Sequence, residues 1–298
     1  MILVDLNQVL ISNLMAQTRG QGDVKPNEEM IRHMVMNSLR GFNQKFRNKY
    51  GNMVLCSDAG NTWRRDIFPQ YKYKRKKDRT ESSFDWDNIF DILTRIKNEL
   101  KENFPYVMMY EEKCEADDII AILTKYYYQH EKIMIVSGDK DFIQLQFYKN
   151  VEQYAPIQKK YVGFDEEGIR LDAKEFLLEQ IMKGDRSDGI PNILSPDDCF
   201  VTGEKQKPMT KKRLEEYSCI DNHTDEIRTN WLRNSKLIDL NQIPQVYEDA
   251  IINSYRSYKV NDRSKLLTYF IENKLKSLME NISDFQHGEI KWQHKTQT

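Results

Sequence analysis

The stretch MYEEKCEADDIIAILTK, residues 109–125, gathers Glu115, Asp117 and Asp118 immediately before an apolar pattern of helical period. Acidic side chains suit the first turn of a helix, because the unpaired N–H groups and the macrodipole there favour negative charge. By itself the stretch therefore fits a helix start as well as a chemical site. The arrangement recurs, since carboxylates follow three further apolar runs: Asp5 after MILV, Asp58 after MVLCS, and Asp139 with Asp141 after KIMIVSG.

Each of these apolar runs has the length and composition of a short buried strand. Helical patterns lie between them, which predicts strands at 1–5, 52–57, 106–110 and 132–137 and helices at about 27–48, 86–103 and 116–129. This alternation predicts an α/β fold with a largely parallel central sheet and helices on both faces. The ligand site of such a sheet lies outside the carboxyl ends of its strands, so we expect the carboxylates to converge on one crevice.

The pattern changes beyond residue 150. Residues 151–156 and 159–164 read as two short strands, consistent with a hairpin, and the chain after Asp172 is predicted to be mainly helical. The predicted helices there are about 172–183, 209–217, 224–235, 245–258 and 263–281. We place a domain boundary near residue 170, giving an α/β domain over 1–170 and a smaller, mainly helical domain over 171–298. A further acidic pair, Asp185 and Asp188, is expected to fold back over the sheet.

The overall composition shows no bias toward an acidic or a basic partner. The 298 residues carry 45 Lys and Arg against 46 Asp and Glu, so attraction for nucleic acid must be local. The four cysteines form no CxxC pair and suggest no disulfide framework. The apolar runs are far shorter than the roughly 18 residues of a membrane span, and the N-terminus lacks the basic start of a signal peptide. A soluble protein of the cytoplasm is predicted.

The predicted crevice would hold many carboxylates: Asp5, Asp58, Glu115, Asp117, Asp118, Asp139, Asp141, Asp185 and Asp188. Like charges so close together raise some pKa values or require cations. Carboxylate oxygens suit Mg²⁺ or Mn²⁺, while the absence of HExxH and of clustered Cys and His argues against zinc. Two such cations about 3.5–4 Å apart can promote phosphodiester hydrolysis by water. Neither GxxxxGK[ST] nor GxSxG is present, so a nucleotide-driven motor or a serine hydrolase has no support.

A basic and aromatic stretch, TWRRDIFPQYKYKRKKDR at residues 62–79, follows Asp58. From Trp63 to Arg79, eight basic residues stand against Asp66 and Asp78, a local charge of +6. Such a mixture suits single-stranded nucleic acid, because cations contact phosphates and rings stack on bases. The alternative is a solvated basic loop over a few packed rings. We expect this arch, about residues 60–85, to be flexible in the free protein. Its candidate nucleic-acid contacts are Trp63, Tyr71, Lys74, Arg75, Lys76 and Lys77.

Five motifs in this order resemble the 5′ nucleases, a family that includes flap endonucleases, the 5′-nuclease domains of bacterial DNA polymerases and T-even-phage-type ribonuclease H. The first motif is Asp5. The second, WRRDIFPQYKYKR, is similar to the family's aromatic–Arg…Pro-x-Tyr-Lys-x-x-Arg signature. EADD, SGDKD and KGDRSDGIP are similar to its acidic motifs. WRRD and NSKLIDLNQIP, residues 234–244, look most like the phage type. The resemblance implies a PIN-like central sheet.

The resemblance also implies roles for the motif residues. Asp5, Asp58, Asp117 and Asp139 would surround a first metal ion, with Glu115 and Asp118 helping directly or through water. Asp141, Asp185 and Asp188 would hold a second ion, largely through waters. Lys72 and either Arg64 or Arg65 would contact the scissile phosphate and stabilise its developing charge.

The chain departs from the family after Pro191. Relatives continue with a glycine-rich hairpin that grips duplex phosphates with the help of a monovalent ion. Here the sequence is NILSPDDCFVTGEKQKPMTKKR, without those glycines. We expect phosphate contacts from basic side chains instead: Lys205, Lys207, Lys211, Lys212 and Arg213. A solvated helix start is the alternative for this basic run.

Together these features predict a Mg²⁺-dependent 5′ to 3′ nuclease that acts on 5′ ends of RNA/DNA and DNA/DNA duplexes and on 5′ flaps. Mn²⁺ would substitute for Mg²⁺. The expected task is removal of RNA primers in lagging-strand replication in a phage. The protein is expected to be a monomer that interacts with a single-strand-binding protein and a sliding clamp. Two alternatives stay open: a PIN-like ribonuclease of single strands, and a structure-specific DNA-binding protein without catalysis.

Overall fold

The computed structural model of the chain describes residues 1–18, 25–82 and 84–285. In this part of the chain a six-stranded sheet has the order β3-β2-β1-β4-β5-β6, parallel throughout except for β6. The strands are β1 Ile2–Asp5, β2 Met53–Cys56, β3 Val107–Met109, β4 Ile133–Val136, β5 Val151–Ala155 and β6 Lys160–Val162. The predicted α/β fold is confirmed, including the hairpin of β5 and β6.

Helices make up most of the remaining described residues. The first half contains α1 Leu6–Thr18, α2 Glu28–Tyr50, α3 Arg64–Ile67, α4 Tyr73–Glu81, α5 Trp86–Asn103, α6 Ala116–Tyr127 and the 3₁₀ helix η1 Lys140–Phe147. The second half contains α7 Ala173–Lys183, α8 Cys199–Thr202, α9 Lys211–Tyr217, η2 Ile220–Asn222, α10 Asp225–Ile238, α11 Gln245–Ser257, α12 Ser264–Glu272, α13 Lys276–Met279 and η3 Ile282–Asp284. Side-chain caps start several of them, as at Asn27, Asp85 and Asp172.

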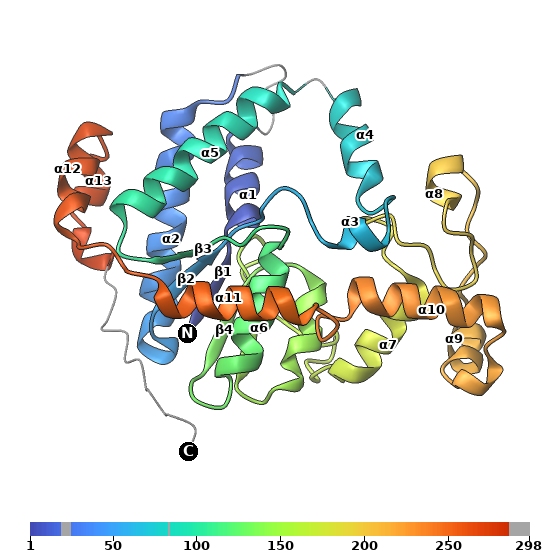
Figure 1. Cartoon of the computed structure of the whole chain (residues 1–298). Coiled ribbons are helices and arrows are strands. Elements are labelled where there is room, and N and C mark those ends of the chain that lie inside the picture. Colours follow the sequence, from blue (N-terminus) through green and yellow to red (C-terminus); the bar gives the residue numbers. More distant parts are fainter. Residues whose placement is uncertain (19–24, 83, 286–298) are drawn as a thin grey trace.

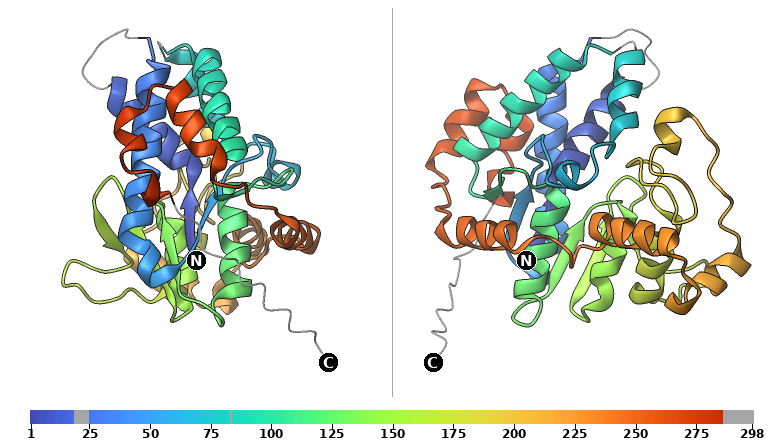
Figure 2. Two further views of the ribbon diagram at one scale, coloured as in Figure 1. Left: turned by 90° about the vertical axis from the view of Figure 1, so that its left-hand side faces the viewer. Right: turned by 45° about the vertical axis from the view of Figure 1, so that its right-hand side comes forward.

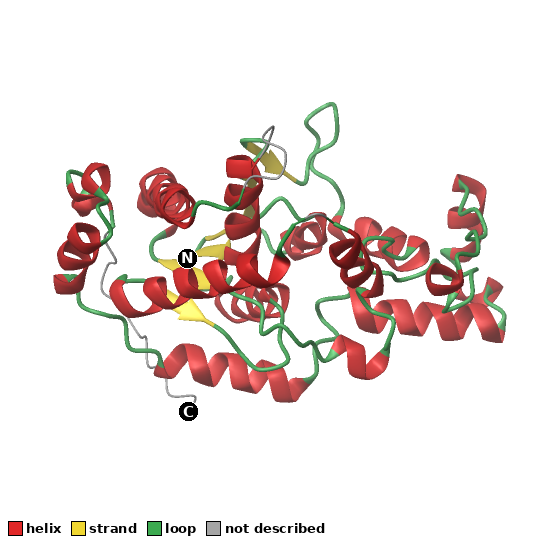
Figure 3. Ribbon diagram, turned by 90° about the horizontal axis from the view of Figure 1, so that it is seen from above, coloured by secondary structure: helices red, strands yellow, loops and turns green. Residues whose placement is uncertain are grey.

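Alternating side chains of each strand enter two separate apolar cores, because successive residues of a strand point to opposite faces. In β1, Ile2 and Val4 pack with α1, α2 and α5, whereas Leu3 packs with α6 and α11. Viewed from above, the strands lie between helices on both sides (Figure 3). The sheet is therefore covered on both faces, and its carboxyl ends carry the loops that hold the predicted site.

The last helices return to the first half of the chain (Figure 1). Phe270 and Phe285 are fully buried beside Phe104, with ring centroids 5.9 and 5.7 Å from that of Phe104. On the other face, α11 contributes Ile251 to the core around α6. Smaller apolar clusters lie under α7, α9 and α10, which stand to one side of the sheet (Figure 2). The domain boundary near residue 170 stays a prediction.

Two local features differ from expectation: no helix was predicted at 6–18, and a single helix was predicted at 263–281. Helix α1 begins directly after Asp5 without a linker, and the Asp5 carboxylate accepts the Gln8 N–H as a cap would. The helix predicted at 263–281 is split, because Lys274 takes a left-handed conformation at φ 55°. The basic arch contains α3 and α4, and its flexibility in the free protein stays a prediction. Across the described ranges, no helix has both the length and the apolarity needed to cross a membrane.

Candidate active site

The carboxylates at the ends of β1 and β2 are fixed by hydrogen bonds. Asp5, the last residue of β1, accepts from the Gln8 N–H and from the Ser137 hydroxyl, each at 3.0 Å. Asp58 follows β2 and accepts from the Ala116 N–H at 2.7 Å, at the first residue of α6. These contacts orient both carboxylates at the carboxyl edge of the sheet, as the sequence predicted for strand-end residues.

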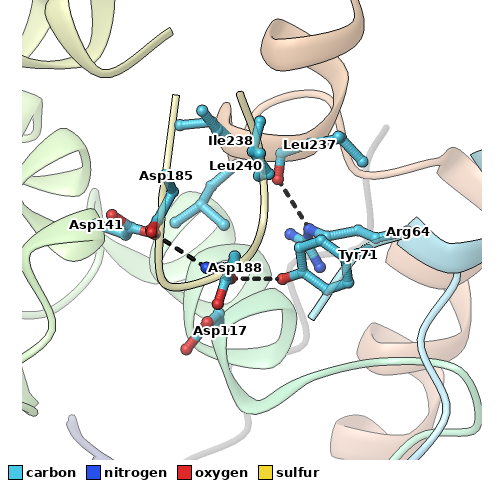
Figure 4. A pocket seen from close by; sticks show the side chains of 10 residues that line it. Arg64, Tyr71, Asp117, Asp141, Asp185, Asp188, Leu237, Ile238 and Leu240 are labelled. Atoms are coloured by element: carbon cyan, nitrogen blue, oxygen red, sulfur yellow. Dashed lines mark hydrogen bonds between the residues drawn. The ribbon is translucent and has the colours of Figure 1, made fainter. Parts of the chain in front are cut away.

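The end of β4 supplies the next two carboxylates. Asp139 caps η1 and accepts from the Asp141 N–H at 3.0 Å. The Asp141 carboxylate accepts from the Gln180 amide of α7 at 2.5 Å. Asp141 lines a small pocket together with Asp117, the second residue of α6 (Figure 4). The pocket therefore joins residues from the sheet edge, α6 and the second half of the chain.

Burial and mutual repulsion shift the titration of this cluster. Burial, with the charges of Asp58 and Asp139, raises the pKa of Asp5 to about 6. Burial, with the charge of Asp139, raises the pKa of Asp141 to about 7 and that of Asp117 well above its usual range. Hard cations relieve such repulsion and prefer carboxylate oxygens, so the donor set fits divalent metal ions. Within the described residues, no three His, Cys, Asp or Glu side chains already form a metal-binding group.

The loop KGDRSDGIP brings Asp185 and Asp188 over the sheet edge. Asp185 accepts from the N–H groups of Ser187 and Asp188 at 2.6 and 3.2 Å, which closes the turn. Gly184 has φ 67°, and a Cβ there would lie 2.3 Å from the Ile190 carbonyl oxygen, so the turn requires glycine. Both carboxylates line the same pocket as Asp117 and Asp141 (Figure 4). The predicted return of this acidic pair thus occurs in the structure.

Asp118 and Arg64 form a buried support for the site. Arg64 is 3% exposed and contacts the carboxylates of Glu115 and Asp118, each at 2.9 Å, and its Nε donates to the Leu237 carbonyl oxygen. Asp118 also accepts from the Trp63 indole N–H at 3.2 Å and from the Glu115 N–H at 2.9 Å. With these partners Asp118 caps the first turn of α6, and it does not line the pocket. Arg64 itself lines the pocket, and its guanidinium is engaged there by the carboxylates of Glu115 and Asp118.

Lys72 links the basic stretch to the acidic cluster. Its N–H donates to the Asp188 carbonyl oxygen at 2.7 Å, and its Nζ lies 2.5 Å from Oε1 of Glu115 and 3.7 Å from Oδ2 of Asp188. Burial favours a protonated Glu115, but Lys72 and Arg64 outweigh this effect and lower the pKa of Glu115 to about 2. Arg75 contacts Asp188 at 2.5 Å. The start of α4 is therefore held by ion pairs to Glu115 and Asp188.

The predicted nucleic-acid contacts divide into buried and exposed groups. Trp63 and Tyr71 are each 3% exposed, so neither ring is available to stack on a base in this conformation. The Tyr71 hydroxyl instead donates toward Glu115 and Asp188 at 3.0 and 2.9 Å. Arg65 is half-buried. Exposed cations remain on α4 and around α9: Lys74, Arg75, Lys77, Lys205, Lys207, Lys211 and Lys212, with Arg213 half-buried. The side chain of Lys76 lies outside the described residues.

Comparison with known proteins divides the chain into two matched parts. Residues 1–174 match the family described as 5′-3′ exonuclease, N-terminal resolvase-like domain, and residues 173–285 match the family described as T4 RNase H, C terminal. The first match covers more than half of the chain. The chain belongs to the 5′-3′ exonuclease family. The predicted family resemblance is therefore confirmed.

Individual relatives of this exonuclease-family chain support the same family. Ribonuclease H of Enterobacteria phage T4 is 33% identical in an alignment 297 residues long, which covers 95% of this chain and 95% of the phage protein. A 5′-3′ exonuclease of Buchnera aphidicola is 27% identical over 73% of this chain and 70% of its own length. Among solved structures, a complex of the bacteriophage T5 flap endonuclease with DNA and metal ions has a TM-score of 0.58 at 14% identity, covering 95% of this chain and 98% of that one. At that identity the likeness shows the fold.

Three groups at the exonuclease-family site escaped the sequence analysis. Gln180 holds Asp141, and the Leu237 carbonyl oxygen holds Arg64. Lys97 of α5 is half-buried, and the charges of Asp58 and Asp5 reach it, although burial lowers its pKa. No motif contains these residues. Only the position of Lys97, beside the buried stripe of α5 that includes Ile96 and Leu100, could have drawn attention to it.

Proposed function

We propose that the chain is a Mg²⁺-dependent 5′ to 3′ nuclease that hydrolyses phosphodiesters at the 5′ ends of RNA/DNA and DNA/DNA duplexes and at 5′ flaps. Family membership supports the reaction class. The observation that carries the proposal is a pocket lined by Asp117, Asp141, Asp185 and Asp188 beside Lys72, a cation that is paired with Glu115 and lies 3.7 Å from Asp188. This arrangement suits phosphodiester hydrolysis. The carboxylates can bind the metal ions that promote the reaction, and the positive charge can stabilise the negative charge that develops on the phosphate oxygens.

The donor sets for two cations follow the carboxylates that face the cluster. Asp5, Asp58, Asp117 and Asp139 would hold the first ion, and Asp141, Asp185 and Asp188 the second. When bound, divalent ions would supply Lewis-acid polarisation of the phosphate and activation of water for its attack. Glu115 and Asp118 take a different part in this proposal, since Arg64 engages both in a buried network. They would position Lys72 and the start of α6.

Lys72 would act as a fixed positive charge. Burial favours its neutral form, but the carboxylates of Asp188 and Glu115 outweigh burial and raise its pKa, so the ammonium group stays protonated. It would donate to a phosphate oxygen as negative charge builds up on the scissile group. Arg75, exposed on the adjacent turn and paired with Asp188, would transfer its contact to a neighbouring phosphate. Both cations would thus exchange a carboxylate for the substrate.

The remaining exposed cations would contact nucleic acid away from the scissile bond. Lys74 and Lys77 lie on α4 and would follow a single strand, whereas Lys205, Lys207, Lys211 and Lys212 would contact duplex phosphates. Because T4 ribonuclease H resembles nearly the whole chain, we propose primer removal during lagging-strand replication of a phage, in the host cytoplasm. We also propose that the protein acts as a monomer together with a single-strand-binding protein and a sliding clamp.

The experiment compares two labelled substrates, a duplex with an RNA 5′ end and a duplex with a DNA flap. Each is incubated with Mg²⁺ or EDTA and with the unchanged protein, Asp139→Asn or the control Asp91→Asn, whose carboxylate is exposed on α5. We expect short 5′ products that require Mg²⁺ and Asp139 but not Asp91. Binding without cleavage in Mg²⁺ and Mn²⁺ would refute the enzyme, and preferred cleavage of plain single-stranded RNA would favour a PIN-like ribonuclease.

A further inference from the structure

Gln180 stands at the boundary between α7 and the acidic pocket. Its side-chain NH₂ donates to Oδ1 of Asp141 at 2.5 Å, the one hydrogen bond between an α7 side chain and a pocket carboxylate among the described residues. Asp141 in turn shares the pocket with Asp117, Asp185 and Asp188. Gln180 therefore sets the direction of one carboxylate at the place where the second cation is proposed to bind.

The other end of the same amide has no partner. Oε1 of Gln180 is shielded from solvent, and no donor within the described part of the chain reaches it. When Asp141 is ionised, as a cation ligand must be, the amide cannot turn over, because only its NH₂ group can donate to the carboxylate. Buried acceptors in proteins are nearly always paired. The unpaired oxygen therefore indicates a donor that does not belong to the chain.

We propose that Gln180 is a positioning residue for the second cation, holding Asp141 through its NH₂ group and accepting, through Oε1, a hydrogen bond from a water of that cation's hydration shell. The inference rests on the proposed function, since it assumes a metal-dependent enzyme. Mg²⁺ keeps several of its waters when it binds proteins, so such donors accompany it. Residues that orient ligands in this way commonly change metal affinity by about 10–100-fold when they are replaced.

The test is direct titration of the whole protein with Mn²⁺, with free Mn²⁺ followed by electron paramagnetic resonance. Gln180→Met keeps the length of the side chain but removes both polar ends, and Gln180→Glu keeps an acceptor and adds a charge. Glu179→Gln is the matched control, because Glu179 is the adjacent residue of α7 and pairs with Lys183 near the surface. Thermal unfolding in EDTA checks that each variant folds.

We expect two binding steps in the unchanged protein and in Glu179→Gln. Gln180→Met should weaken one step by about tenfold and leave the other unchanged. Gln180→Glu, which removes the NH₂ group that holds Asp141, should weaken the same step. Equal Mn²⁺ binding by the unchanged protein and Gln180→Met would overturn the role of Gln180 while leaving the proposed function intact. Absence of Mn²⁺ binding by the unchanged protein would overturn both. If Gln180→Met fails to fold, two unchanged steps in Gln180→Glu would overturn the role of the NH₂ group that holds Asp141.

Discussion

Lys72 and Glu115 are paired at 2.5 Å, and the second carboxylate oxygen of Glu115 is already engaged by Arg64. Glu115 is thus neutralised from two sides in the free protein. A phosphate that drew Lys72 away would release one oxygen of Glu115 at the moment the substrate arrives. In the proposed function, the pair would therefore couple the occupancy of the basic stretch to that of the acidic cluster.

Replacement of Lys72 by Met should slow cleavage by about 10²–10³-fold, because a charge that stabilises the transition state is lost. Substrate affinity should change far less, since many other cations contact the phosphates. Single-turnover cleavage at several enzyme concentrations separates the two effects. Lys74→Met, two residues away on the exposed side of α4, is the control. A change confined to affinity would show that Lys72 only binds substrate.

Replacement of Arg64 by Met should destabilise the protein by about 3–5 kcal/mol, because it leaves the buried carboxylates of Glu115 and Asp118 without their partner. Arg65→Met should change stability by no more than about 0.5 kcal/mol, since Arg65 is half-exposed and supports no such network. Urea unfolding of the metal-free proteins measures both values. Equal stabilities would contradict the structural role of Arg64 and return it to the list of phosphate contacts.

The metal-free protein should lose stability as the pH rises. The folded pKa of Asp5, about 6, and that of Asp141, about 7, exceed the ordinary value of 3.8, so both groups bind protons more tightly when folded. Their contribution is complete below about pH 4 and is lost as the pH passes 6 and 7. For Asp5 alone the loss is about 3 kcal/mol, at about 1.4 kcal/mol per pKa unit.

Urea unfolding in EDTA between pH 5 and 8 tests this prediction. Asp5→Asn should flatten the profile, and Mg²⁺ should stabilise the protein more at pH 8 than at pH 5. Glu115 acts in the opposite direction: its pKa of about 2 adds stability that disappears as the pH falls from 4.5 toward 2. A profile that rises steadily from pH 5 to 8 in EDTA would contradict the burial of the cluster.

Replacement of Lys211 and Lys212 by Ala should weaken duplex binding and reduce its dependence on salt. Each lost phosphate contact lowers the slope of log affinity against log salt by about 0.9. Affinity for a single strand should hold, because α4 supplies that contact in our proposal. The control is Lys159→Ala with Lys160→Ala, an exposed pair on the β5–β6 hairpin. An unchanged salt slope would mean that α9 lies away from the duplex.

The sequence was sufficient to predict the sheet because its strands are short apolar runs ending in Asp or a turn. Asp5, Asp58 and Asp139 were predictable as strand-end residues for the same reason. Motif spacing, however, could not separate Asp117, which lines the pocket, from Asp118, which is buried beside Trp63 and Arg64. Adjacent residues of a helix point in different directions, and only packing decides which one meets the crevice.

Contacts between distant segments were also beyond prediction. The Leu237 carbonyl oxygen and the Gln180 amide belong to no motif, and their importance arises from where α10 and α7 pack. The basic composition of the arch gave no sign of α4, nor of the carboxylates on other elements that pair with Lys72 and Arg75. The local composition of a segment indicates how much conformational entropy is lost when it becomes ordered. It does not show the long-range ion pairs that offset this loss.

The burial of Phe270 and Phe285 against Phe104 has a consequence for how the protein is made. A nascent chain contains every carboxylate of the site long before the residues that cover Phe104 are synthesised. Until then Phe104 lacks this cover, and contacts between such distant residues form slowly. Complete folding therefore waits for the final helices, and a ribosome-bound chain that stops before Phe270 would be a client for chaperones rather than a smaller nuclease.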